Sequence, residues 1–163
     1  MMRARGGRGA GLIVLTLVAA LLLALLPMPD WAAPFRPPWV ALALLYWALA
    51  LPQRVGVFTA FTCGILLDVV TGTLLGQHAL SLSVVTYLAV VLHRRMRLFP
   101  WLQQTLSVGM LLLLERLLFL WLLGATGQPM PPPLYWATAV SGTLLWPWVY
   151  WLLGDLSRRA RVG

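Results

Sequence analysis

Six long apolar runs dominate this sequence, and each is closed by charged residues or by a Pro/Gly-rich break. They cover residues 10–26, 39–51, 55–70, 77–92, 102–123 and 134–153. A helix of about 20 apolar residues crosses the hydrocarbon core of a bilayer and satisfies its own backbone hydrogen bonds. Hydrophobic residues make up 61% of the chain and charged residues only 10%. So few charged residues could not cover the surface of a soluble protein. We therefore expect an all-α integral membrane protein, a single transmembrane domain over 1–163 built as a bundle of six transmembrane helices.

The arginines predict how this bundle is oriented. All 12 basic residues are Arg, and ten of them fall on one side if the chain crosses the membrane six times. Cytoplasmic loops are enriched in Lys and Arg, so both termini of this multi-pass protein are expected in the cytoplasm. An odd number of spans would place one Arg cluster outside. The ten inner residues are Arg3, Arg5, Arg8, Arg54, Arg94, Arg95, Arg97, Arg158, Arg159 and Arg161.

Two segments leave alternatives open. The run 39–51 is barely long enough to span, and a re-entrant hairpin over 39–70 would keep the same orientation. The first run also follows basic residues, as in a cleaved signal peptide, but its length and the residues Trp31 and Pro34 around the possible cleavage site argue against one. Most of the nine Trp residues fall near the predicted interfaces, whereas Trp47 and Trp146 lie inside runs and are expected to pack or to face a partner.

A stripe of small residues marks the third run. Its members recur every four residues and surround a carboxylate: Ala60, Gly64, Asp68, Gly72 and Gly76. Helices in lipid associate where small residues let their backbones approach closely. The stripe therefore predicts either close packing inside the bundle or a docking face for a helix of another protein. A turn at 71–73 would shorten it.

Polar residues within the runs form the second group of candidates, namely Asp68, Gln77, His78, Glu115 and Arg116. Such residues face the protein interior or a partner, and they serve ion pairing, recognition, or handling of a proton or substrate. Asp68 and Arg116 fall at similar depth, so we predict a buried ion pair between them. Glu115 is expected to be the poorer partner for Arg116, because adjacent residues on a helix point about 100° apart.

Catalysis has little support in this composition. The chain has no Lys, a single cysteine (Cys63), two His and four carboxylates, and it lacks HExxH, CxxC, Gly-x-Ser-x-Gly and phosphate-loop motifs. We expect no enzyme, cofactor or metal site, and a membrane enzyme of lipid metabolism is disfavoured for the same reason. The net charge of +8 does not indicate nucleic-acid binding in so apolar a chain. Its inner arginines either attract anionic membrane lipids or only set the topology.

An ordered string of motifs over residues 44–104 resembles MreD, the rod-shape-determining membrane protein family of bacteria. The string runs Tyr46-Trp47, Leu51-Pro52-x-Arg54-x-Gly56, Gly64-x-Leu66-x-Asp68, Gly72-x-x-Leu75-Gly76-Gln77-His78-Ala79, Tyr87, Arg94-Arg95 and Phe99-Pro100-x-x-Gln103-Gln104. The Arg/Gly-rich segment 3–11 and the Pro-rich loop 128–133 match no known pattern.

The resemblance implies a non-enzymatic scaffold of the cell-elongation (rod) complex, or elongasome. Its partners would be MreC, RodA with its class B penicillin-binding protein, and the MreB filament. The bundle would be similar to the substrate-binding subunit of energy-coupling-factor transporters. The stripe and the intramembrane charges would recognise MreC's membrane helix and so organise peptidoglycan synthesis. The alternative is a transporter-like subunit that binds a small molecule or lipid in an outward-facing polar cavity lined by Asp68, Gln77 and His78.

Overall fold

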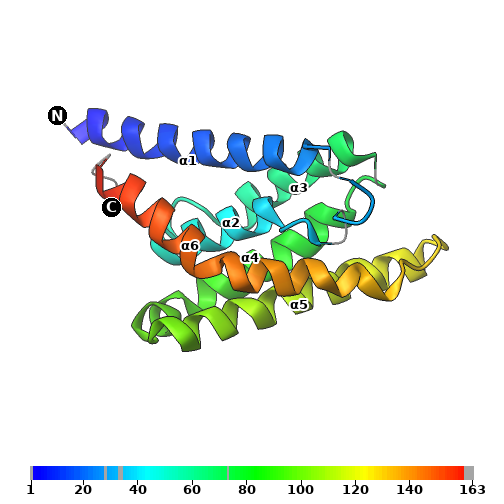
Figure 1. Cartoon of the computed structure of the whole chain (residues 1–163). Coiled ribbons are helices and arrows are strands. Elements are labelled where there is room, and N and C mark those ends of the chain that lie inside the picture. The colour runs from blue at the N-terminus through cyan, green and yellow to red at the C-terminus, as the bar shows by residue number, and fades with distance from the viewer. Residues whose placement is uncertain (1, 28, 33–34, 73, 160–163) are drawn as a thin grey trace.

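The computed structural model describes residues 2–27, 29–32, 35–72 and 74–159, and this part of the chain is helical with no strand (Figure 1). By length and composition, two of its helices, α4 and α5, are apolar enough to cross a membrane. The all-helical prediction is confirmed. The elements in order are α1 (Met2–Leu25), α2 (Trp39–Ala50), α3 (Val57–Thr71), α4 (Gln77–Leu98), α5 (Trp101–Ala125), the short 3-10 helix η2 (Pro133–Trp136) and α6 (Ala137–Arg159).

Two helices extend well beyond the carboxyl-terminal ends of their apolar runs. α4 continues to Leu98 through the basic segment 93–97, and α6 continues to Arg159, beyond the apolar run that closes at 153. Charged residues mark the end of the apolar part of each helix, but the helix itself continues through them. Basic residues in a last turn interact favourably with the helix dipole, and α4 ends just before Pro100, which disfavours helix in the residue preceding it.

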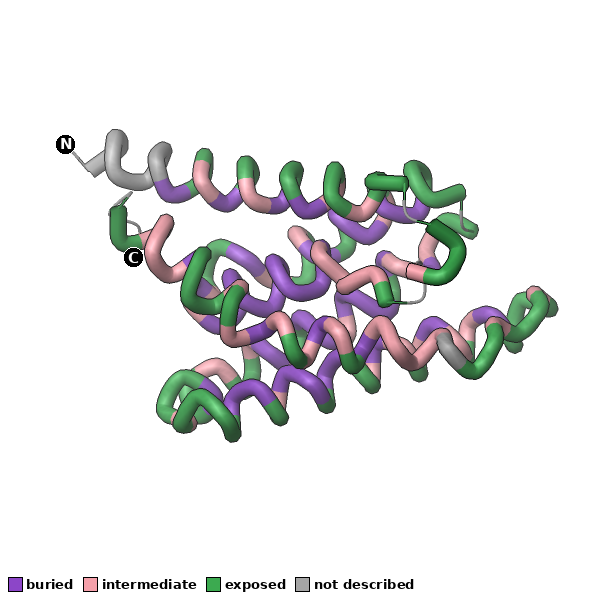
Figure 2. Tube along the Cα trace, viewed as in Figure 1, coloured by how far each residue is buried: buried purple, intermediate pink, exposed green. Residues whose placement is uncertain are grey.

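α2 forms the centre of the bundle. Every residue from Val40 to Leu49 is buried, and the helix packs against α1, α4 and α6 (Figure 2). Its 12 residues span only about 18 Å, less than the roughly 30 Å hydrocarbon core. A helix that is apolar all round belongs in a core. α3 packs chiefly on α4, so α2 and α3 do not form the closely paired hairpin of the re-entrant alternative.

Two tryptophans in this core are buried with their ring N–H groups hydrogen-bonded. Trp47 donates to the Thr16 hydroxyl at 2.8 Å, which ties α2 to α1. Trp146 donates to the Gln104 side-chain oxygen at 3.3 Å, which ties α6 to α5. Both residues therefore pack inside the bundle, the first of the two roles predicted for them.

The basic residues gather at one end of the bundle. The start of α1, the α2–α3 connection, the α4–α5 turn and the end of α6 all lie at this end (Figure 1). We call it the Arg-rich end; its described members are Arg54, Arg94, Arg95, Arg97, Arg158 and Arg159. Arg161 and the side chains of Arg3, Arg5 and Arg8 lie outside the described residues. The end of α1, the start of α2, the end of α3, the start of α4 and the end of α5 lie at the opposite end (Figure 1).

Candidate functional site

The stripe of small residues lies between α3 and α4 of the same chain. A Cβ atom added to Gly64 would lie 2.3 Å from the Ala79 Cα atom, so the two backbones touch. Ala60, one turn earlier, is fully buried. This geometry supports the packing interpretation. It leaves no room at Gly64 for a helix of another protein.

The last two glycines of the stripe form a turn instead of continuing the helix. Gly72 ends α3 with a φ of 73°, and Gly76 precedes α4 with a φ of 101°. Glycine adopts this left-handed region without steric cost, which is why five residues suffice to connect α3 to α4. The close α3–α4 contact therefore begins with Gly64 and ends in a glycine turn.

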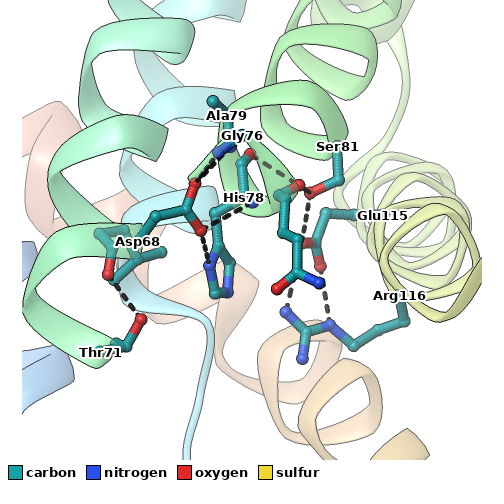
Figure 3. Close-up of polar contacts among 10 residues, drawn as sticks. Asp68, Thr71, Gly76, His78, Ala79, Ser81, Glu115 and Arg116 are labelled. Carbon is teal, nitrogen blue, oxygen red and sulfur yellow. Dashed lines mark hydrogen bonds and ion pairs between the residues drawn. The ribbon is translucent and has the colours of Figure 1, made fainter. Parts of the chain in front are cut away.

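Asp68 joins the end of α3 to the start of α4 across this turn (Figure 3). Its buried carboxylate accepts hydrogen bonds from the backbone N–H of Gly76 at 2.9 Å and of His78 at 3.0 Å. The His78 Nδ1 atom lies 2.7 Å from the same carboxylate. A carboxylate at a helix N-terminus satisfies free N–H groups and interacts favourably with the helix dipole. Asp68 thus acts as a cap supplied by a neighbouring helix.

Arg116 pairs with Glu115, and the predicted pair between Asp68 and Arg116 is wrong. The Arg116 Nε atom lies 2.7 Å from one Glu115 oxygen and a terminal nitrogen lies 3.2 Å from the other. Ser81 on α4 also donates to Glu115 at 3.2 Å. Adjacent side chains leave a helix in different directions, but these two are long and flexible enough to meet. Asp68 is occupied by α4 backbone, a local partner that the depth argument did not consider.

Two aromatic rings complete the surroundings of Arg116. Its guanidinium carbon lies 5.6 Å from the centre of the Phe119 ring and 5.0 Å from that of Tyr135, distances typical of cation–π contacts. The Tyr135 hydroxyl donates to the Arg116 carbonyl at 3.1 Å. The sequence prediction missed both rings. The i, i+3 spacing of Arg116 and Phe119 was the available signal.

Gln77, which directly precedes His78, is buried, and its side chain has no hydrogen bond within the described residues. Among the described residues, neither its amide nitrogen nor its oxygen has a partner, and the residue is 2% exposed. Each buried unsatisfied polar atom costs about 1–3 kcal/mol.

A cavity of about 190 Å³ opens beside Glu115 and Arg116, lined by the end of α1, the start of α2, the end of α3 and the start of α4. Its polar lining comes from Arg36, Thr71, His78, Glu115, Arg116 and Thr138. Of the three residues predicted to line such a cavity, only His78 does so. Arg36 donates to the Ala24 carbonyl at 2.8 Å and to the Leu26 carbonyl, and so caps the end of α1. In the described part of the chain, no three His, Cys, Asp or Glu residues lie together as metal ligands would.

Comparison with known proteins gives the cluster its context. The model of the family "rod shape-determining protein MreD" matches residues 7–155. The chain belongs to the MreD family. It is 32% identical over 149 residues to the rod shape-determining protein MreD of Haemophilus influenzae, a match that covers 89% of this chain and 90% of the relative. No solved structure matches.

The MreD match confirms the resemblance seen in the motif string and extends it. It covers nearly the whole chain, including α5 and most of α6, whereas the string ended at residue 104. It also contains Asp68, Gln77, His78, Glu115 and Arg116. The family and the relative's name support a membrane protein with a role in rod-shape determination.

Proposed function

We propose that this MreD-family chain is a non-enzymatic inner-membrane scaffold of the rod complex. It binds the membrane helix of MreC and thereby organises peptidoglycan synthesis by RodA and its class B penicillin-binding protein near the MreB filament. Family membership is the observation that carries this role. The geometry adds support, because the intramembrane charges Asp68, Glu115 and Arg116 are engaged by hydrogen bonds and an ion pair within the chain.

The proposed orientation places six spans across the inner membrane with both termini in the cytoplasm. Its support is that α1 begins and α6 ends at the Arg-rich end, as the positive-inside rule requires of the cytoplasmic side. Reporter fusions after Phe99 and at the carboxyl terminus should report cytoplasm, and a fusion after Gln128 should report periplasm. A periplasmic carboxyl terminus would overturn the orientation.

The site proposed for MreC is an apolar groove between α1 and α6, with α2 as its floor. The groove holds about 190 Å³, and the alanines Ala19, Ala20 and Ala43 line it together with Leu23 and Leu152. Lipid gives no hydrophobic drive for helix association, so a partner helix needs small residues that allow close packing. α1 packs on α2 and α3, which leaves this side of the bundle for one further helix. The groove replaces the stripe as the predicted partner face.

Filling the groove tests this function. Leu23 lines the groove, whereas its neighbour Leu22 is exposed outside it. Leu23→Trp should abolish co-purification with MreC from detergent and convert rod cells to round ones, while the amount of protein in the membrane stays unchanged. Leu22→Trp adds the same ring at the same depth and should bind MreC normally. Equal binding by both variants would contradict the groove as the site.

The transporter-like alternative depends on the polar cavity beside His78. Its volume of about 190 Å³ falls below the roughly 300–1,000 Å³ of typical ligand pockets. Its charged lining residues Glu115 and Arg116 also satisfy each other. These two observations favour the scaffold. A small molecule that co-purifies with wild-type protein and is lost in His78→Ala would favour the alternative.

A further inference from the structure

Two adjoining recesses open at the Arg-rich end, where α2, α4, α5 and α6 meet. They hold about 240 and 210 Å³ and share two lining residues, Arg97 and Tyr150. The first recess continues along Tyr46 and Ser157, and the second along Trp101 and Gln104. The two recesses therefore adjoin at Arg97 and Tyr150, and together they are called the Arg97 site.

Arg97 is the charged group of this site, and no other group neutralises it. Among the described residues it has neither a hydrogen bond nor an ion pair, and no carboxylate lines either recess. At the opposite end of the bundle, by contrast, Arg116 forms an ion pair with Glu115 at 2.7 Å. At the Arg-rich end itself, Arg159 pairs with Asp155 at 3.0 Å. Arg97 is therefore left with its positive charge directed at an open recess.

The walls around Arg97 are formed by packed, hydrogen-bonded side chains. Tyr46 is 5% exposed and meets Tyr150 edge-on, with ring centres 5.7 Å apart. Gln104 is buried beneath the second recess, where it donates to the Met96 carbonyl at 3.1 Å. A packed floor with tyrosine, serine and arginine groups above it offers several hydrogen-bond donors to one anion.

The recess also opens beside apolar groups that suit a membrane interface. Leu98, the last residue of α4, is 85% exposed, and Trp101, the first residue of α5, is 71% exposed. Tryptophan concentrates at the level of lipid headgroups. A ligand in this recess would thus place an anionic group on Arg97 and an apolar part along Trp101 and Leu98.

We propose that this site binds the phosphate of an anionic phospholipid in the leaflet that faces the Arg-rich end. A guanidinium pairs with phosphate through two parallel charge-assisted hydrogen bonds, and basic recesses between transmembrane helices suit lipid headgroups. The assignment to the inner leaflet rests on the orientation in the proposed function. The recess itself is independent of MreC, so loss of either activity leaves the other measurable.

Native mass spectrometry of the full chain, purified in detergent and supplied with phosphatidylglycerol, tests the site. Arg97→Gln should retain about tenfold less phosphatidylglycerol than wild type, as expected for the loss of one charge-assisted contact. Arg94→Gln is the matched control: it removes the same charge one turn earlier, outside both recesses, and should retain the lipid. Arg97→Lys keeps the charge without the paired geometry and should fall between the two.

Three outcomes would overturn the proposal. The first is an equal loss in Arg97→Gln and Arg94→Gln, which would mean general attraction by the basic end. The second is equal retention of phosphatidylcholine, which would mean that the net charge of the lipid is irrelevant. The third is full displacement of the lipid by millimolar inorganic phosphate, which would assign the site to a soluble anion. Insertion of each variant is checked by its monodispersity in the same preparation.

Discussion

The two ends of this MreD-family bundle hold charge in opposite ways. Away from the Arg-rich end, Asp68 and Glu115 are buried and Arg116 is half-buried, and each of the three is engaged by a partner within the chain. At the Arg-rich end, Arg94 and Arg97 are exposed and, among the described residues, have no ion pair. The buried charges connect helices. The exposed charges are available to the membrane.

The difference follows from what surrounds each charge. An unpaired charge in the interior costs several kcal/mol, so it persists only with a partner. An arginine at the interface meets water and lipid phosphate, and it needs no partner from the chain. A count of charged residues in the sequence does not distinguish the intramembrane charges from the exposed ones. The effects of substitutions on stability should distinguish them.

The largest effect is expected from breaking the buried pair on α5. Arg116→Gln leaves Glu115, which is 1% exposed, without its cation, and should cost about 3–5 kcal/mol of stability. The double variant Glu115→Gln with Arg116→Gln removes both charges and should be less destabilised than Arg116→Gln alone. Thermal unfolding in detergent and abundance in membranes measure both. A double variant as unstable as the sum of the two single variants would refute the pairing.

A smaller effect is expected from the α3–α4 contact. Gly64→Ala places a methyl group against the Ala79 backbone, which cannot move aside by a side-chain rotation. The substitution should lower the free energy of unfolding by about 1–3 kcal/mol. Gly124→Ala is the control, because its new methyl group would lie 3.5 Å from the flexible end of the Met130 side chain, which is ordinary van der Waals contact. Unfolding temperatures should therefore fall more for Gly64→Ala. The reverse order would mean that the two helices are not in backbone contact.

The smallest effect is expected at the Arg-rich end. Arg94→Gln removes an exposed charge without a partner in the described chain and should change stability by less than about 0.5 kcal/mol. The measurement is the same unfolding assay. A loss comparable to that of Arg116→Gln would show that the two ends do not differ in the way described.

The sequence predicted the helices and their order because each apolar run is bounded by charges or by Pro and Gly. It placed Gly64 correctly in a close contact but left its partner open, since small residues favour any helix that approaches. It failed for Arg116: depth along a helix says which residues are level, but not that Asp68 is already bound by the N-terminus of α4. The recess at Arg97 is formed by residues from four helices. No local sequence pattern therefore predicts it.

The scaffold account is tested most directly by disulfide cross-linking in native membranes between this chain and MreC with cysteines along its membrane helix. Ala19→Cys places a thiol in the groove between α1 and α6, and Met110→Cys places one on the 71% exposed face of α5. Native Cys63 is buried and serves as the unreactive background. We expect a cross-link from Ala19→Cys and none from Met110→Cys. A cross-link only from Met110→Cys, or from neither position, would contradict the account.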